Sequence, residues 1–471
     1  MGHSSSIALG IALEKPSRTV YCFDGDGALL MHMGALCVNT SKKLSNLKHI
    51  VFNNQAHDSV GSQPTVASGI NLTEIAKNAG YEKVYSVDSK DDLEHVLSTF
   101  IKEQCTSMLE IKIKCGARAD LGRPKEKPWE NKKIFMENLN QIDFCYRGAV
   151  ENLSSILNNE SVHRALVFTG KKSFLKIKSI IDKELKDVVA VYYNNFSTNP
   201  KKEELDIAIH KLGSKYDIII AVGGGSIMDF AKAYRYYTGM TTKLIAIPTT
   251  FGTGAEATQF AVIYQNGVKM SLDDKSILPE YAIVDSQFAT TTLPYLKACT
   301  AMDAFCQAIE SYWAVNATKD SRELAKQAIM ICKEVIVKYV NTDDLDAAKS
   351  MAFASHIAGK AINISRTTAA HALSYKITSD YAIPHGHAVA LSIARLFEYN
   401  LKNGKYKELE DILTDDPVTY FDDLFNKIGL NYRCKEIGIS DIESIVENVN
   451  LERLSNNPCK LEKDDLIKLF W

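Results

Sequence analysis

The run DIIIAVGGGSIMDFAKA at 217–233 places a strongly hydrophobic strand directly before three glycines and the start of a helix. Such a turn presents backbone N–H groups and the positive end of a helix dipole to a pyrophosphate. The next hydrophobic run, LIAIPTTFGTGAEAT at 244–258, repeats the arrangement with hydroxyl donors at Thr249 and Thr250. One glycine turn after a strand is a weak signal, whereas two on successive strands would rarely arise by chance and favour an α/β sheet that binds a pyrophosphate group.

The composition is that of a globular protein with several domains. The 471 residues are 46% hydrophobic and 24% charged, with a formal net charge of -2. This balance offers no basic footprint for nucleic acid or an anionic membrane, and no apolar run approaches the roughly 18 residues of a membrane span. The 10 cysteines are scattered without a CxxC pair, which favours reduced thiols and a cytoplasmic protein.

Three compositional regimes divide the chain. Residues 1 to about 125 alternate β-rich runs with helical stretches, a βαβ pattern. Residues 116–133, GARADLGRPKEKPWENKK, are basic and turn-rich and are interpreted as a tail or linker. A new α/β unit begins near Phe144, and from about Leu293 the pattern is mostly amphipathic helix.

The motif GDG at 25–27, followed by NN at 53–54, has the spacing of a diphosphate-and-magnesium clamp. Residues 21–23 are predicted to form a buried strand that delivers Asp26 to its carboxyl end, where α/β sheets bind ligands. A carboxylate and the amide oxygen of Asn53 suit a Mg²⁺ ion that keeps phosphate oxygens as its other ligands. Two ordinary turns would produce the same pattern.

A second set of polar residues lies in the helical region. Asp303 and Gln307 are at i and i+4 in MDAFCQAIESYW, so they share one helix face. His371 follows in TTAAHALSY, and His385 follows in PHGHA. One aspartate and two histidines can bind Fe²⁺ or Zn²⁺ with room left for substrate. The alternative is that His371 packs within a helix and His385 is an ordinary turn residue.

The first region resembles the thiamin-diphosphate-binding domain of phosphonopyruvate decarboxylases, through GHS at 2–4, GDGALLMHMG at 25–34 and NNQAHDSVGSQPT at 53–65. The resemblance covers 1–138 and implies thiamin diphosphate with Mg²⁺. It implies magnesium ligands at Asp26, Asn53 and the Gln55 carbonyl, with Ser4, His32 and the segment 57–63 near the cofactor.

Such decarboxylases also need a glutamate that activates the thiamin aminopyrimidine, on a domain that normally precedes this one. The sequence begins at the GH motif itself. We therefore expect the thiamin half to be inactive alone and to need another polypeptide, or the sequence to be a truncated gene product. Because thiamin sites are usually assembled between subunits, the resemblance also implies a homo-oligomer.

The region 141–471 resembles the iron-containing alcohol dehydrogenase family, which is related in fold to dehydroquinate synthase. PTTFGTGAEAT and the 14 positions from His371 to His385 carry the resemblance, and KAINISRTTAAHALSY points within the family to phosphonoacetaldehyde reductases. It implies an α/β dinucleotide-binding domain over 141–292 and an all-helical metal-binding domain over 293–471. The implied dinucleotide ligands are Gly224, Gly225, Ser226, Asp229, Thr249, Thr250 and Lys269, and the implied metal ligands are Asp303, His371 and His385.

Two residues depart from the family pattern. Gln307 stands where the family usually has a histidine, and its oxygen is a harder, weaker donor than imidazole. It can ligate the metal, bind it through water, or hydrogen-bond the substrate. Tyr375 replaces a histidine implicated in proton transfer, which leaves Tyr375, His387, a ribose hydroxyl or water to deliver the proton.

The strand ALVFTG ends in Gly170, where many relatives carry an aspartate that pairs with the adenosine ribose of NAD. Its absence, together with Lys171 and Lys172, favours NADPH over NADH. Two solvated lysines at a strand end are the alternative.

These motifs together predict a fusion enzyme of phosphonate metabolism. A partner-dependent thiamin domain would decarboxylate phosphonopyruvate, and the reductase would convert phosphonoacetaldehyde to 2-hydroxyethylphosphonate. Arg366, Lys360 and Lys376 flank the His371 motif and are the predicted ligands of the phosphonate. One alternative is a general iron-type alcohol dehydrogenase with a decayed thiamin domain. Another is a non-catalytic subunit in which both sites have degenerated.

Overall fold

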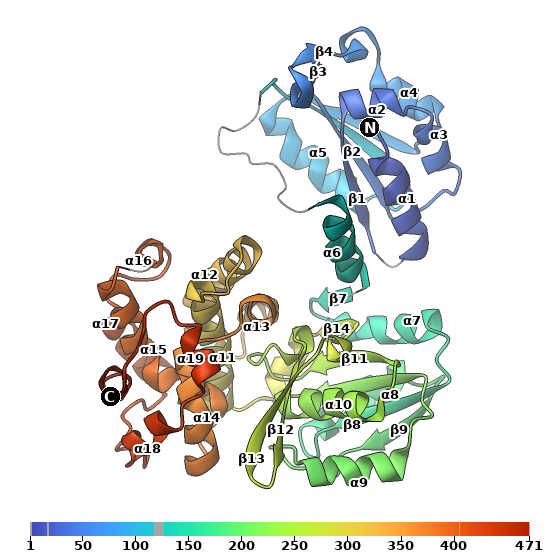
Figure 1. Cartoon of the computed structure of the whole chain (residues 1–471). Helices are drawn as coiled ribbons and strands as arrows, with labels where there is room; N and C mark the ends of the chain where they lie inside the picture. The colour runs from blue at the N-terminus through green and yellow to red at the C-terminus, as the bar shows by residue number, and fades with distance from the viewer. Residues whose placement is uncertain (1, 17, 117–126, 141, 405, 471) are drawn as a thin grey trace. The chain divides into compact units, whose positions relative to one another are not determined.

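The computed structural model describes all residues except 1, 17, 117–126, 141, 405 and 471. The chain forms two compact units, 1–127 and 128–471 (Figure 1). Within the described residues, no helix is both long enough and apolar enough to cross a membrane.

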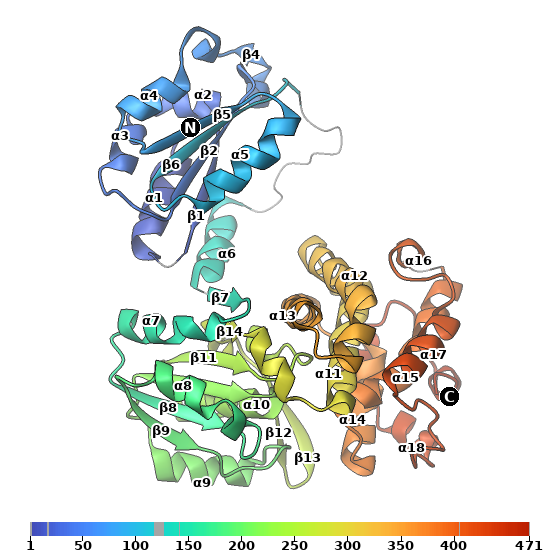
Figure 2. The same ribbon diagram turned by 180° about the vertical axis from the view of Figure 1, so that it is seen from behind.

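The first unit is a four-stranded parallel sheet in the order β1-β2-β6-β5, with helices on both faces (Figure 2). The strands are β1 (Val20–Gly25), β2 (Leu47–Asn53), β5 (Lys83–Val87) and β6 (Ser107–Lys112). Helix α5 (Lys90–Lys102) packs on one face through Phe100. The other face is covered by α1 (Ser4–Glu14), α2 (Asp26–Met31), α3 (Ala35–Thr40) and α4 (Leu72–Asn78). This arrangement confirms the predicted βαβ pattern.

Two expectations for this region are corrected. Strand β1 is not buried along 21–23, because it is an edge strand and its side chains alternate: Cys22 is buried, whereas Phe23 is 61% exposed. The predicted linker at 116–133 lies partly outside the described residues, and its final part begins helix α6 (Pro128–Asn140). That helix belongs to the second compact unit, although the predicted first domain extended to 138.

The second unit opens with a six-stranded parallel sheet in the order β7-β14-β11-β10-β8-β9. The strands are β7 (Ile142–Cys145), β8 (Arg164–Thr169), β9 (Val189–Tyr193), β10 (Ile218–Gly223), β11 (Lys243–Pro248) and β14 (Tyr281–Val284). One face is covered by α7 (Asn152–Asn159) and α8 (Lys178–Glu184), and the other by α9 (Lys202–Leu212) and α10 (Gly225–Thr238). The central strand β10 is buried along its whole length, as its run of isoleucines predicts. An antiparallel hairpin, β12 (Phe260–Gln265) and β13 (Val268–Asp273), follows the second glycine turn.

After β14 the described chain is helical, which confirms the predicted change near Leu293 (Figures 1 and 2). The long helices are α11 (Pro294–Trp313), α12 (Lys319–Asn341), α13 (Leu345–Ser365), α14 (Ala369–Tyr381) and α15 (His385–Lys402). Shorter helices follow at α16 (Glu408–Ile412), α17 (Pro417–Ile428), α18 (Ile442–Glu447), α19 (Leu451–Ser455) and α20 (Lys463–Ile467). Helix α11 is buried almost throughout at the centre of this bundle, so polar residues on it are held rigidly.

Candidate active site

A cavity of about 260 Å³ in the second unit joins the glycine turn to the predicted metal residues. Gly225 and Ser226 line it from the start of α10. Asp303 on α11, His371 on α14 and His385 at the start of α15 also line it. The fold therefore brings together two motifs that are well separated in the sequence.

The two glycine turns pack against each other. A Cβ atom at Gly224 would lie 3.1 Å from the Thr250 hydroxyl, and one at Gly225 would lie 3.0 Å from the Thr253 methyl group. The Thr249 N–H donates to the Gly223 carbonyl at 3.1 Å and ties the turns together. Glycine suits both positions because a larger side chain would require the neighbouring threonine side chains to shift.

Asp229 and Lys269 face the same cavity from α10 and β13. Burial raises the pKa of Asp229, against the opposing charges of Lys232 and Lys269. Burial lowers the pKa of Lys269 to about 7, against the charge of Asp229. Of the seven predicted dinucleotide ligands, Gly225, Ser226, Asp229 and Lys269 line the cavity, and Gly224, Thr249 and Thr250 belong to the adjoining turns.

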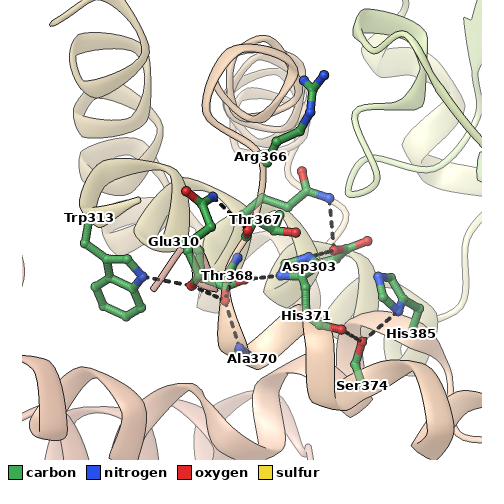
Figure 3. A network of polar contacts seen from close by, with 12 residues as sticks. Asp303, Glu310, Trp313, Arg366, Thr367, Thr368, Ala370, His371, Ser374 and His385 are labelled. Carbon is green, nitrogen blue, oxygen red and sulfur yellow. Dashed lines mark hydrogen bonds and ion pairs between the residues drawn. The ribbon is translucent and has the colours of Figure 1, made fainter. Parts of the chain in front are cut away.

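The donor atoms of Asp303, His371 and His385 all lie within 4.8 Å of one another. His371 Nε2 lies 3.3 Å from an oxygen of Asp303, and its Nδ1 contacts Glu310 (Figure 3). Burial opposes charge on His371, but Glu310 and Asp303 outweigh it and raise its pKa to about 9. Negative charge that attracts a proton equally attracts a metal cation.

Glu310 was not singled out from the sequence. One of its oxygens accepts hydrogen bonds from the Thr368 N–H, the Thr368 hydroxyl and the Ala370 N–H, at 3.2, 2.6 and 2.9 Å (Figure 3). The other contacts His371, so Glu310 fixes the orientation of that ring. A signal was present in the sequence, because Asp303, Gln307 and Glu310 follow one another at i, i+4 and i+7 on one helix face.

The hydrogen bonds of Gln307 indicate whether a metal ion would suit this group of residues. Its amide N–H atoms donate to Asp303 at 3.0 Å and to the Thr253 carbonyl at 3.2 Å. Its amide oxygen is buried and, among the described residues, has no hydrogen-bond partner. A free buried acceptor beside two imidazoles and a carboxylate fits a divalent cation, because a metal would satisfy it.

The three predicted phosphonate ligands are not brought to the cavity, whose described lining includes none of them. Lys360 pairs with Asp143, and Lys376 pairs with Asp380 at 2.7 Å. Arg366 points away from His371 in Figure 3 and pairs with Asp273 at 2.7 Å. Nearness to His371 in the sequence was misleading. Lys376, for example, lies five positions after His371 on α14, about 140° around the helix.

The structure places the two side chains predicted for proton delivery in different surroundings. Tyr375 lines the cavity, and its ring lies 6.2 Å from that of His385, measured between centroids. His387 is absent from the described lining and uses both nitrogens elsewhere, with Tyr295 at 2.9 Å and the Asn431 carbonyl at 2.6 Å. Residues two apart on a helix point in nearly opposite directions, so His385 and His387 cannot share one site.

In the first unit, Asp26 follows β1 and Asn53 ends β2, at the same edge of the sheet. Both are buried, and Asp26 accepts a hydrogen bond from Thr65 at 2.5 Å. The Asn53 amide oxygen accepts from the Gln55 N–H at 3.1 Å, while its amide nitrogen donates to Glu110 at 2.7 Å. The oxygens of Asp26 and Asn53 are thus held at one edge, as a magnesium site would require.

The other residues predicted near the thiamin cofactor lie in the same unit. His57 packs against Gly27, where a Cβ atom would lie 2.4 Å from the imidazole. The rings of His3 and His32 lie edge to face with centroids 4.6 Å apart. Ser4 hydrogen-bonds with the Cys22 thiol.

Comparison with family models identifies both units. Residues 143–286 match iron-containing alcohol dehydrogenase, and residues 297–471 match the C-terminal domain of the Fe-containing alcohol dehydrogenase family. Residues 1–111 match the C-terminal TPP-binding domain of thiamine pyrophosphate enzymes. The chain therefore joins two domains of unrelated chemistry, as the motifs predict.

Individual relatives agree with the assignment of the second unit to the alcohol dehydrogenase family. An NADPH-dependent butanol dehydrogenase of Clostridium saccharobutylicum is 31% identical over 294 residues, covering 54% of this chain and 76% of that protein. A phosphonoacetaldehyde reductase of Streptomyces viridochromogenes is 31% identical over 211 residues, covering 39% and 53%. The crystal structure of sulfoacetaldehyde reductase from Bifidobacterium kashiwanohense with NAD⁺ superposes with a TM-score of 0.65 at 26% identity, covering 70% of this chain and 96% of that one.

Proposed function

The chain belongs to the iron-containing alcohol dehydrogenase family, and from this premise we propose that its second unit reduces phosphonoacetaldehyde to 2-hydroxyethylphosphonate. The observation that carries the proposal is the single cavity shared by the Gly225 turn and the Asp303, His371 and His385 triad. A reductase of this type needs its dinucleotide and its metal at one substrate site. A non-catalytic subunit would not need to maintain both.

Two findings support the substrate. The similarity to a phosphonoacetaldehyde reductase covers about half of that protein. The first unit matches a thiamin-enzyme domain, and its motifs resemble those of phosphonopyruvate decarboxylases, whose product is that aldehyde. A tether between the two would raise the effective concentration of the reductase around a reactive intermediate.

When bound, a divalent metal supplies Lewis acidity toward the aldehyde oxygen, and a reduced nicotinamide supplies the hydride. Asp303, His371 and His385 would hold the metal, and the amide oxygen of Gln307 would offer a fourth donor atom. Glu310 keeps His371 turned toward Asp303. We propose that the proton reaches the alkoxide by way of Tyr375, since of the two predicted side chains it is the one that lines the cavity.

We propose NADPH as the preferred dinucleotide. Lys171 and Lys172 are exposed and come directly after Gly170, the position at which relatives of the NAD type carry a carboxylate. The comparison of kcat/KM for NADPH and NADH tests this assignment, and equal values would contradict it.

We propose that the first unit binds thiamin diphosphate through a Mg²⁺ ion held by Asp26 and Asn53, and that another polypeptide completes its active site. The buried oxygens at the shared edge of β1 and β2 support the magnesium assignment. Decarboxylation of phosphonopyruvate by the purified chain alone would rule out the need for a partner.

A reductase of sulfoacetaldehyde is the second candidate, favoured by the structural match to an enzyme with that activity. The deciding experiment follows nicotinamide oxidation by the metal-loaded protein with phosphonoacetaldehyde, sulfoacetaldehyde and acetaldehyde. A large preference for phosphonoacetaldehyde is expected. A rate with acetaldehyde that matches both anionic substrates would indicate a general alcohol dehydrogenase, and no turnover of any aldehyde would favour a non-catalytic subunit.

A further inference from the structure

Arg453, on the short helix α19, lines the same cavity as the proposed metal ligands. Its guanidinium lies 5.6 Å from the centroid of the Phe260 ring, and its side chain hydrogen-bonds with Tyr375. The ring of Tyr375 in turn lies against that of His385. Arg453 is therefore separated from the metal ligands by one side chain.

The charge of Arg453 is not matched by a carboxylate. Among the described residues, its guanidinium takes part in no ion pair. The carboxylates that line the cavity are engaged elsewhere: Asp229 interacts with Lys269, Asp273 pairs with Arg366, and Asp303 belongs to the metal group. An arginine on a cavity wall with unfilled donors is a binding site for an anionic group.

The backbone that carries Arg453 is held at both ends. The Arg453 N–H donates to the side chain of Asn450 at 2.8 Å, which caps the start of α19. At the other end, the buried Asn456 side chain donates to the carbonyls of Ser365 at 2.9 Å and Thr367 at 3.0 Å. These bonds fasten α19 to the segment that leads into α14, so the position of Arg453 relative to the metal group is set before substrate binds.

We propose that Arg453 is the anion-binding residue of this cavity, and that it receives the tetrahedral oxyanion group of a short aldehyde whose carbonyl faces Asp303, His371 and His385. A phosphonate and a sulfonate share this chemistry, since both present oxygens that the parallel N–H donors of a guanidinium can bind together. The inference rests on the proposed function and names the residue that selects its substrate. A neutral aldehyde would leave the cation without a partner, which costs binding energy.

The test compares kcat/KM of the full-length, metal-loaded protein and its Arg453→Gln and Arg453→Lys variants. The substrates are phosphonoacetaldehyde, sulfoacetaldehyde and butanal. In Arg453→Gln, the ratio of kcat/KM for the anionic substrates to that for butanal is expected to fall about 10- to 100-fold, chiefly through KM. Arg453→Lys keeps the charge but loses the paired donors, and should recover part of the ratio. The larger loss, on phosphonoacetaldehyde or on sulfoacetaldehyde, identifies the natural anion.

Lys376→Gln is the matched control, because it removes one positive charge from the neighbouring α14 at an exposed ion pair outside the described cavity lining. It should leave the substrate ratio unchanged. An equal loss on all three substrates in Arg453→Gln would overturn the inference, since it would mean that Arg453 only supports Tyr375.

Inhibition of butanal reduction by ethylphosphonate separates this inference from the proposed function. If the wild-type protein prefers butanal, the proposed function fails, yet Arg453 is still supported when ethylphosphonate inhibits the wild type and not Arg453→Gln. Equal inhibition of both proteins, or of neither, would overturn the anion-binding role.

Discussion

Two buried histidines in the second unit have nearly the same surroundings and different expected roles. His371 lies between Asp303 and Glu310, and His356 lies between Asp143 at 3.4 Å and Glu256 at 3.2 Å. Burial opposes charge on each ring, but the paired carboxylates outweigh it and raise the pKa of each to about 9. Local chemistry alone therefore does not separate them.

The two histidines differ in the residues that lie beyond their carboxylate partners. Beside His371 stand the cavity and a further imidazole, His385, so that a cation can enter and find a third ligand. Beside His356 stands the ammonium of Lys360, which contacts Asp143 and takes the place that a metal would need. His356 joins helix α13 to strand β7 and to the turn after β11, and so ties the helical bundle to the sheet. We therefore expect a histidine between two carboxylates to bind a metal only where space and a further donor are present.

The largest expected effect is that of His385→Ala. Loss of a ligand should remove the metal and lower kcat/KM by more than about 1,000-fold, because Lewis-acid catalysis contributes several kcal/mol. Elemental analysis and aldehyde reduction measure both. His210→Ala, an exposed histidine on α9, is the control and should change neither. Full metal content in His385→Ala would mean that His385 is not a ligand, and that the His371 site does not differ from the His356 site in the way proposed.

The reverse experiment is His356→Ala. Removal of the ring leaves the buried carboxylate of Glu256 and the half-buried carboxylate of Asp143 without their shared partner, and should lower the free energy of unfolding by about 3–5 kcal/mol. Urea denaturation of the metal-free protein measures the change, again beside His210→Ala. The folded variant should still bind its metal. If His356→Ala loses metal while its stability is unchanged, the assigned roles are wrong.

A smaller effect is expected for Glu310→Gln. The amide can still accept from Thr368 and Ala370, but it no longer balances charge on His371, so metal affinity should fall about 10- to 100-fold. Competition with a chelator measures the affinity. The analogous change Glu256→Gln, beside His356, should leave metal affinity unaltered. An equal loss in both variants would mean that the whole unit, rather than this contact, governs metal binding.

The smallest expected effect is a pH dependence of stability that originates at His356. Its pKa of about 9 in the folded state lies above the ordinary 6.5, so the protonated ring stabilises the fold. That contribution is complete below pH 6.5 and is lost as the pH rises through 9. Between pH 7 and 8.5 the wild-type protein should lose about 1–2 kcal/mol relative to His356→Gln in urea denaturation. Parallel curves for the two proteins would contradict the assignment.

Asp143 determines the lower limit of the pH range in which this cluster stabilises the fold. Burial opposes its charge, but His356 and Lys360 hold the pKa of its carboxyl well below the usual range. Its contribution is therefore present above pH 3.8 and is lost as the pH falls further, so the cluster stabilises the fold most between about pH 4 and 6.5.

Much of the fold followed from short-range sequence patterns. The isoleucine run before Gly223 predicted a strongly hydrophobic strand, and the loss of strand patterns near Leu293 predicted the helical bundle. These predictions succeeded because periodicity and glycine turns are local properties. The burial of strand β1 was predicted wrongly, since its place at the edge of the sheet depends on the order of strands and not on its own residues.

The site was predictable to the same extent. Asp303, His371 and His385 could be chosen from residue type and spacing, and the structure places their donor atoms together. The cations could not be chosen in that way. Lys360 and Arg366 lie close to His371 in the sequence but pair with Asp143 and Asp273, which come from other elements.

By itself the sequence determined which chemistries are present, because strand patterns, glycine turns and ligand types are encoded over a few neighbouring residues. Tertiary structure alone decided which charges remain free for a substrate. Arg453 lies 82 positions after His371 and reaches the cavity because Asn456 fastens α19 beside α14. Whether a charge is neutralised depends on atoms within a few ångströms, and sequence distance carries almost no information about that.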